Sequence, residues 1–217
     1  MKKFEYHITP WIINKFFPHF RIKNKLEILN ILLETVRYIT PYNHSSIVET
    51  VGKITIIVDK MSRIFFFTEE KAYSITFPFF ILEKGDEIKL ALNNIEIDSS
   101  LISNLIAIIS QGDFLDVNSI DFLDLIINYE VESESFLRVL QELLMYEDGY
   151  IRYDYDNDGY QEAKRNGWEH RHPLNHFDLF YTNKATFKIG LENKILVDEF
   201  IDIVDVKTDC KYMKKWQ

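Results

Sequence analysis

The residues best suited to chemistry lie close together between positions 150 and 182. Three histidines, His170, His172 and His176, fall within seven residues, and Asp178 follows closely. An imidazole exchanges protons near neutral pH and binds metals, and a carboxylate can orient an imidazole or bind a cation. This density of polar groups predicts a functional site in the segment.

The acidic run before these histidines matches the beginning of a calcium-binding loop. Residues 154–159 are D-Y-D-N-D-G, which fits the pattern D-x-D-x-D-G. The match then ends, because loop position 8 is Gln161 instead of an apolar residue and position 12 is Arg165 instead of glutamate. The residues before the run also predict a strand. We therefore exclude an EF-hand and predict a turn at 157–159.

A second interpretation uses the spacing of the histidines. His172 and His176 are four residues apart with Asp178 close behind, which suggests a site of two histidines and one carboxylate. Pro173 disfavours helical backbone at His172, so such a site requires a bend that brings His172 round. Further ligands for it would have to come from elsewhere in the chain, with Asp59, Asp113 and Asp116 as candidates.

The third interpretation uses alternation along two predicted strands, 150–156 and 176–182. If these strands are neighbours, one face collects the polar side chains of Arg152, Asp154, Asp156, His176 and Asp178, and Lys188 follows on the next strand. A histidine that titrates near neutral pH, beside carboxylates and fixed cations, suits hydrolysis of a phosphate ester or phosphodiester. Metal held by the carboxylates would be the assisted version of this chemistry.

The predicted roles divide the polar face between proton transfer, charge stabilisation and metal binding. They are general acid or base for His176, orientation for Asp178, charge stabilisation for Arg152 and Lys188, a further catalytic histidine in His172, and metal binding for Asp154 and Asp156. A divalent metal ion is the predicted cofactor, and its identity stays open. The alternative is a sheet face that meets water, with cross-strand Arg–Asp pairs worth about a few tenths of a kcal/mol each.

The flanking segments predict an α+β fold: antiparallel β segments, a helical middle and a C-terminal antiparallel sheet. Helical spacing of apolar residues predicts helices at 21–39, 101–110, 120–127 and 134–146, and a closing helix at 195–204. Runs of β-branched and aromatic residues predict strands at 53–58, 63–67 and 72–82, with Pro78 bending the last, and a hairpin around Asn93-Asn94. The polar stretch 157–171 predicts a long loop. We expect one α+β domain over 1–217, with a subdivision near residue 98.

Composition limits the class of protein. With 47% hydrophobic residues the chain can bury a sizeable core. Cys210 is the only cysteine, which excludes an internal disulfide and a zinc site built on cysteines of one chain. The apolar runs are too short to cross a bilayer, and polar residues interrupt the N-terminal segment. We expect no signal peptide, no membrane partner and a cytoplasmic location.

The net charge of −9 disfavours a general nucleic-acid-coating surface, although nucleic acid is not excluded as a substrate. Charge is distributed unevenly: residues 83–148 carry fifteen acids against Lys84, Lys89 and Arg138, whereas residues 1–25 are basic. The acidic region 83–148 is therefore the predicted surface for a protein partner. The motifs of nucleotide-binding loops, dinucleotide folds, serine hydrolases and zincins do not occur in the sequence.

The C-terminal third carries a recognisable signature. E-D-G-Y-I-R-Y-D-Y-D, H-P-L-N-H-F-D-L-F-Y and F-K-I-G-L, within 147–191, resemble a family of short bacterial proteins described only as a domain of unknown function. The resemblance implies a bacterial, cytoplasmic, defence- or mobile-element-associated protein, and it points to Arg152, Asp154, His172, His176, Asp178 and Lys188 as important. Taken together, we expect a nuclease-like hydrolase; the alternative is a non-catalytic subunit that binds a larger partner.

Overall fold

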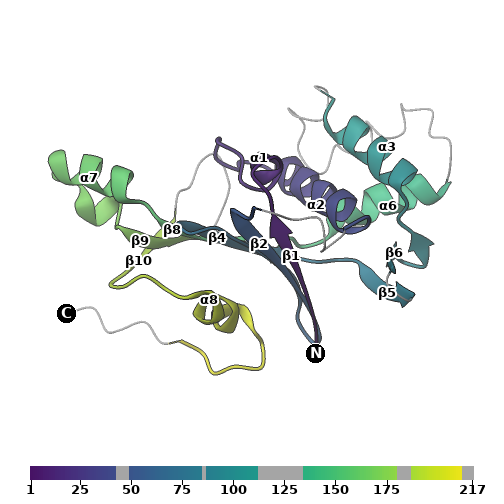
Figure 1. Ribbon diagram of the computed structural model, residues 1–217. Coiled ribbons are helices and arrows are strands. Elements are labelled where there is room, and N and C mark those ends of the chain that lie inside the picture. Colours follow the sequence, from purple (N-terminus) through teal and green to yellow (C-terminus); the bar gives the residue numbers. More distant parts are fainter. Residues whose placement is uncertain (43–48, 85–86, 112–133, 180–186, 212–217) are drawn as a thin grey trace.

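The computed structural model describes residues 1–42, 49–84, 87–111, 134–179 and 187–211, and a seven-stranded antiparallel sheet forms its centre (Figure 1). Its strands, in spatial order, are β1 (Lys2–Ile8), β2 (Gly52–Val58), β3 (Ser62–Phe67), β4 (Lys71–Thr76), β8 (Ile151–Tyr155), β9 (Asn175–Asp178) and β10 (Lys188–Leu191). A smaller sheet contains β5 (Phe80–Lys84), β6 (Glu87–Leu92) and β7 (Ile95–Glu96). The predicted α+β class with antiparallel sheets is confirmed.

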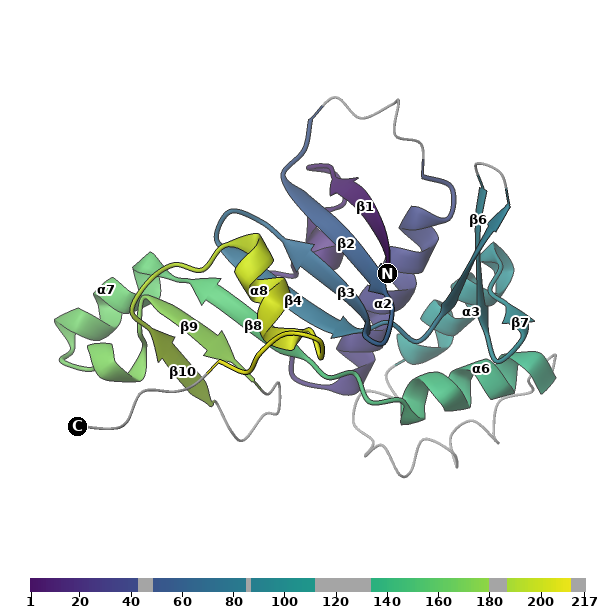
Figure 2. The same cartoon turned by 90° about the horizontal axis from the view of Figure 1, so that it is seen from below.

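Helices cover the two faces of the large sheet unequally. The described helices are α1 (Ile13–Phe16), α2 (Lys25–Ile39), α3 (Ser99–Ile109), α6 (Glu134–Met145), α7 (Asn157–Arg165) and α8 (Val197–Val204), with a 3-10 turn, η2, at Glu169–Arg171. α2 packs on one face and contacts α3 and α6, whereas α8 crosses the other face (Figures 1 and 2). None of these described helices has the length and apolar character needed to span a membrane.

The larger core lies under α2, which is long and apolar enough to bury most of one side. Asn24 begins the helix by accepting a hydrogen bond from the Glu27 amide at 3.0 Å, a usual capping arrangement. Leu29, Leu32 and Val36 of α2 are fully buried against the sheet. A second core forms on the opposite face, where Phe200 of α8 packs with Phe65, Phe67, Tyr153 and Phe177.

The site strands join the rest of the sheet through β4. β8 pairs antiparallel with β4, with Tyr73 opposite Arg152 and Lys71 opposite Asp154. The chain between these two strands leaves the sheet, forms the smaller sheet, α3 and α6, and returns. Its ends meet where the Thr76 amide donates to the Asp148 carbonyl at 2.7 Å.

Several predicted elements differ from the structure. The predicted loop 157–171 was wrong, because residues 157–165 form α7 and residues 169–171 form η2. β1 was missed. Its residues alternate between charged and apolar, as in a strand, but the polar and proline-containing stretch that follows obscured this pattern. The predicted strand 72–82 is divided at Pro78 into β4 and β5, in agreement with the expected bend. The predicted helix 120–127 lies outside the described residues.

Candidate functional site

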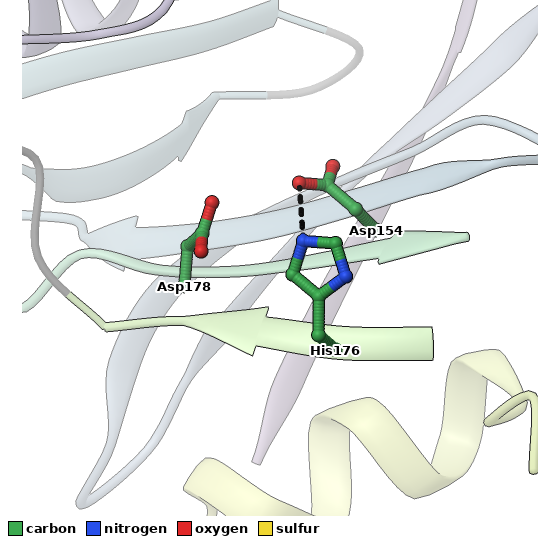
Figure 3. A group of neighbouring side chains, drawn as sticks. All are labelled: Asp154, His176 and Asp178. Atoms are coloured by element: carbon green, nitrogen blue, oxygen red, sulfur yellow. Dashed lines mark ion pairs between the residues drawn. The ribbon is translucent and has the colours of Figure 1, made fainter. Parts of the chain in front are cut away.

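Strand pairing assembles the predicted polar face. β8 and β9 pair antiparallel with Arg152 opposite Asp178 and Asp154 opposite His176, and β10 places Lys188 opposite Asp178. Residues two apart on a strand point to the same face. Figure 3 accordingly shows Asp154 from β8 and His176 and Asp178 from β9 projecting to one side. The predicted neighbour relation of the two strands is confirmed.

This polar group lies on the face of the large sheet that carries α2, beside the apolar core under that helix. Tyr73, which pairs with Arg152, belongs to the core under α2, so the same face changes from apolar to charged between β4 and β8. The side chains are nevertheless buried: His176 has no exposed surface, and Asp178 and Asp154 are 3% and 5% exposed. This burial excludes the alternative of a sheet face that meets water.

Opposite charges compensate one another inside the group. Arg152 bonds both Asp178 and Asp154, the latter at 2.8 Å, and Lys188 donates to Asp178 Oδ1 at 3.0 Å. Burial opposes the charge on Arg152, but neighbouring Tyr150, Asp154 and Asp178 outweigh it and raise the pKa of the guanidinium. Burial would likewise raise the pKa of Asp178, yet Arg152 and Lys188 hold it below its usual value. Both groups therefore stay ionised at neutral pH.

His176 is neutral and has a fixed tautomer. Its Nδ1 lies 2.8 Å from the Pro173 carbonyl oxygen, which can only accept, so Nδ1 carries the proton. Nε2 is then an acceptor and lies 2.5 Å from Lys188 Nζ, which donates. Burial and the Lys188 charge lower the pKa of His176. The group that orients the ring is thus the Pro173 carbonyl, whereas Asp178 accepts from Arg152 and Lys188.

Asp154, His176 and Asp178 form a group that could hold a metal ion. One donor atom from each lies within 4.8 Å of the others, and all three side chains are buried. Asp154 Oδ2 is 3.7 Å from His176 Nε2, the contact dashed in Figure 3. Asp154 Oδ1 is buried and has no hydrogen-bond partner. A buried carboxylate oxygen without a donor is costly, and cation or ligand binding removes that cost.

His172 lies beside this group with a different partner. Its Nε2 is 2.8 Å from Asp156 Oδ2, and its ring centroid is 5.1 Å from that of His176. Asp156 also begins α7, because its Oδ1 accepts from the Gly159 amide at 2.8 Å. The predicted turn residues 157–159 thus form the first turn of α7. His172 and Asp156 make a pair of their own next to the potential ligand group.

Of the further ligands considered for a two-histidine site, Asp59 lies in the described part of the chain, and the structure does not bring it to the site. Asp59 bonds Lys207 and lies 3.7 Å from the N-terminal amine, away from the site strands. Asp113 and Asp116 lie outside the described residues.

A cleft of about 480 Å³ borders the polar group. Arg152, Asp154 and Asp156 line it, so three of the predicted site residues meet this space directly. The segment 16–22, which begins at the last residue of α1, also lines the cleft, together with Glu70 and Lys71. Fully buried His176 lies behind Asp154.

Sequence inspection missed several residues of the cleft, namely His19, Phe20, Arg21, Glu70, Lys71 and Asp158. The basic character of residues 1–25 was the available signal for the lining residues of segment 16–22. Nothing in the local pattern connected that segment to the C-terminal strands, because β4 lies between them: Tyr73 of β4 donates to the Phe16 carbonyl and pairs with Arg152 of β8.

No protein-family model matches the chain, and neither the curated proteins nor the solved structures include a significant match. The bacterial, defence-associated family suggested by the C-terminal signature therefore stays a prediction.

Proposed function

We propose that the protein hydrolyses a phosphate ester or phosphodiester bound in the cleft beside Asp154. The single observation that carries the proposal is Asp154 Oδ1, a buried carboxylate oxygen without a hydrogen-bond partner in a residue that lines the cleft. Such an oxygen is suited to accept a proton from an attacking water, or to bind a cation that orients this water.

The mixture of charges in the cleft supports phosphate chemistry. The cations Arg21, Lys71 and Arg152 can bind the non-bridging oxygens of a phosphate. The acids Asp156 and Asp158 stand near Asp154 along the same rim and favour a metal ion. A divalent cation bound by Asp154 would polarise the phosphorus–oxygen bonds of a substrate in the cleft. Anion-binding and cation-binding side chains in one cleft are what metal-assisted hydrolysis requires.

The buried residues behind Asp154 supply rigidity in this proposal. Arg152 is held by Asp178, and Lys188 by Asp178 and His176, so each charged group has an opposite or accepting neighbour. Before a cation binds, this network of paired groups keeps Asp154 and Arg152 in one geometry. His176 has an unprotonated Nε2 at neutral pH, as a base requires, but Lys188 covers that atom.

The test is release of product from bis(p-nitrophenyl) phosphate, single-stranded RNA and DNA, and nucleotides, with Mg²⁺, Mn²⁺ or Zn²⁺ added. We expect wild-type activity with at least one substrate, and a loss of about 10²-fold or more in Asp154→Asn. Asp198→Asn, an exposed aspartate of α8, is the matched control and should retain full activity. Intact substrates under all conditions, or equal activity in Asp154→Asn, would overturn the proposal.

A second candidate, a partner-binding subunit, is favoured by one observation just before the predicted acidic region 83–148. Phe80 and Leu82 of β5 are 65% and 53% exposed, and β5 is an edge strand of the smaller sheet. Exposed apolar side chains on a sheet edge suit addition of a strand from another protein. A stoichiometric partner retained by Asp154→Asn and lost in Phe80→Lys would support this function.

A further inference from the structure

We propose that Asp154, His176 and Asp178 bind one divalent transition-metal ion, and that the Lys188 ammonium holds the cation position until the ion displaces it. The inference names the cation of the proposed hydrolytic site and in that sense rests on the proposed function. It is tested by binding, so its outcome is separate from that of the hydrolysis assay.

The donor atoms are already gathered. They come from two adjacent, hydrogen-bonded strands and lie within 4.8 Å of one another in a buried setting. Ligands on paired strands are held more rigidly than ligands on loops. Folding of the two strands therefore already places the ligand atoms together before an ion binds.

The histidine is oriented as a metal ligand requires. The Pro173 carbonyl oxygen lies 2.8 Å from His176 Nδ1 and accepts its proton in a hydrogen bond. The lone pair of Nε2 is therefore directed toward the carboxylates. Backbone carbonyls commonly hold metal-binding histidines in this way, because they set both the tautomer and the ring direction. Asp154 Oδ1, buried and unpartnered, gives the site a further free acceptor.

Lys188 contacts two of the three ligands. Its Nζ lies 2.5 Å from His176 Nε2 and 3.0 Å from Asp178 Oδ1, so an ammonium stands where a metal would bind. The side chain is 16% exposed and belongs to β10, the last strand of the sheet, and its flexible stem allows it to move toward solvent. Arg152 bonds Oδ2 of Asp178 and therefore leaves Asp178 Oδ1 to the ion.

The ligand set indicates the class of ion. One imidazole nitrogen with carboxylate oxygens suits Zn²⁺ or Mn²⁺, whereas Mg²⁺ and Ca²⁺ prefer oxygen ligands alone. Charge is also consistent: Asp154 and Asp178 balance Arg152 and Lys188, so departure of Lys188 leaves one net negative charge for the incoming ion. The site is thus self-neutral without metal and attractive to metal once Lys188 leaves.

The experiment titrates chelator-treated protein with Zn²⁺, Mn²⁺ and Mg²⁺ by calorimetry, with Co²⁺ absorption as a second readout. We expect one Zn²⁺ or Mn²⁺ per chain, with Mg²⁺ binding much more weakly. Lys188→Met should bind Zn²⁺ or Mn²⁺ roughly tenfold more tightly than wild type, because the competing cation is gone. His176→Gln should bind roughly tenfold or more weakly and lose the cobalt spectrum.

Two control variants separate a specific effect from a general one. His170→Gln removes an exposed histidine and Lys60→Met an exposed lysine, and both should bind metal as wild type does. Lys188→Met binding no more tightly than wild type, or His176→Gln binding equally well, would overturn the inference. If Lys188→Met unfolds without metal, failure of Zn²⁺ to restore its circular dichroism spectrum would overturn it too.

The hydrolysis result is distinguishable from the binding result. Metal binding with the expected variant pattern but no turnover on any substrate would keep the metal site and overturn the proposed function. Turnover that survives chelation, in a chain that binds no metal, would do the reverse.

Discussion

Arg152 and Asp178 stand directly opposite each other on β8 and β9, and the guanidinium that joins them also bonds Asp154 at 2.8 Å. One guanidinium thus bonds two buried carboxylates, and Lys188 supplies the second positive charge. The charge balance of the buried site therefore depends strongly on Arg152.

Replacement of Arg152 by Met should lower the free energy of unfolding by about 3 kcal/mol, because two buried carboxylates lose a charged partner. Urea unfolding monitored by circular dichroism would measure it. Arg138→Met is the matched control: its exposed pair with Glu134 on α6 should contribute about 0.5 kcal/mol or less. Equal effects of the two substitutions would contradict the role given to Arg152.

Gly190 matters because of the residue that faces it. A Cβ at this position would lie 2.8 Å from Pro173 Cγ, and the Pro173 carbonyl fixes the tautomer of His176. Gly190→Ala should therefore displace Pro173, cost about 1–2 kcal/mol of stability and weaken the Nδ1 hydrogen bond. Thermal unfolding gives the first effect, and ¹⁵N chemical shifts of the His176 ring give the second. An unchanged ring tautomer with unchanged stability would count against this coupling.

Stability of the chelator-treated protein should fall as the pH drops below 6.5. Burial and Lys188 lower the pKa of His176 from its ordinary 6.5, so the unfolded chain takes up this proton at a higher pH than the folded one. The contribution of neutral His176 is complete above 6.5 and decreases from there down to the folded pKa. Urea unfolding at about pH 7.5 and about pH 5.5 measures the difference.

His176→Gln supplies the comparison for the pH effect, since it removes the titrating ring. The variant should lose less stability than wild type between the two pH values, whereas His170→Gln, at an exposed position, should behave as wild type. A pH dependence that is identical in wild type and His176→Gln would show that another group titrates.

Asp156 has two functions that a matched substitution can separate. Asp156→Ala removes the cap of α7 and the partner of His172, and should cost about 1 kcal/mol and increase amide exchange along α7. Asp98→Ala removes a similar cap from α3, where Asp98 accepts from Leu101 at 2.7 Å. Only the first should alter the side-chain signals of His172. Changes in His172 in both variants would mean that its environment responds to general destabilisation.

The polar face was predictable because it depends on a local rule. Side chains alternate between the two faces of a strand with a period of two. Once the strands predicted at 150–156 and 176–182 are neighbours, this alternation places Arg152, Asp154, His176 and Asp178 on one face of the sheet. Lys188 follows by the same rule on β10. Chemistry that resides on neighbouring strands close together in the chain is therefore visible in the sequence.

The cleft was not predictable in the same way. Lys71 reaches it through β4, whose pairing with β8 joins strands far apart in the sequence, and Arg21 reaches it from the segment that follows α1. Hydrophobic periodicity carries no information on which strand is the neighbour of another. α7 was missed for a local reason: D-N-D-G predicts a turn, but the same Asp156 side chain can cap a helix. The burial of His176 likewise depends on tertiary packing.

The excursion between β4 and β8 leaves and re-enters the sheet at one point, where Thr76 meets Asp148. Because its two ends are already held together by the rest of the sheet, a change of length in this segment leaves the positions of β4 and β8 unchanged. Each added residue also increases the entropic cost of closing the segment only slightly. Insertions and deletions there should accumulate over evolution more freely than in β8, β9 and β10. Homologous chains would then vary in size within this excursion while the spacing of Arg152, Asp154, His176 and Asp178 stays constant.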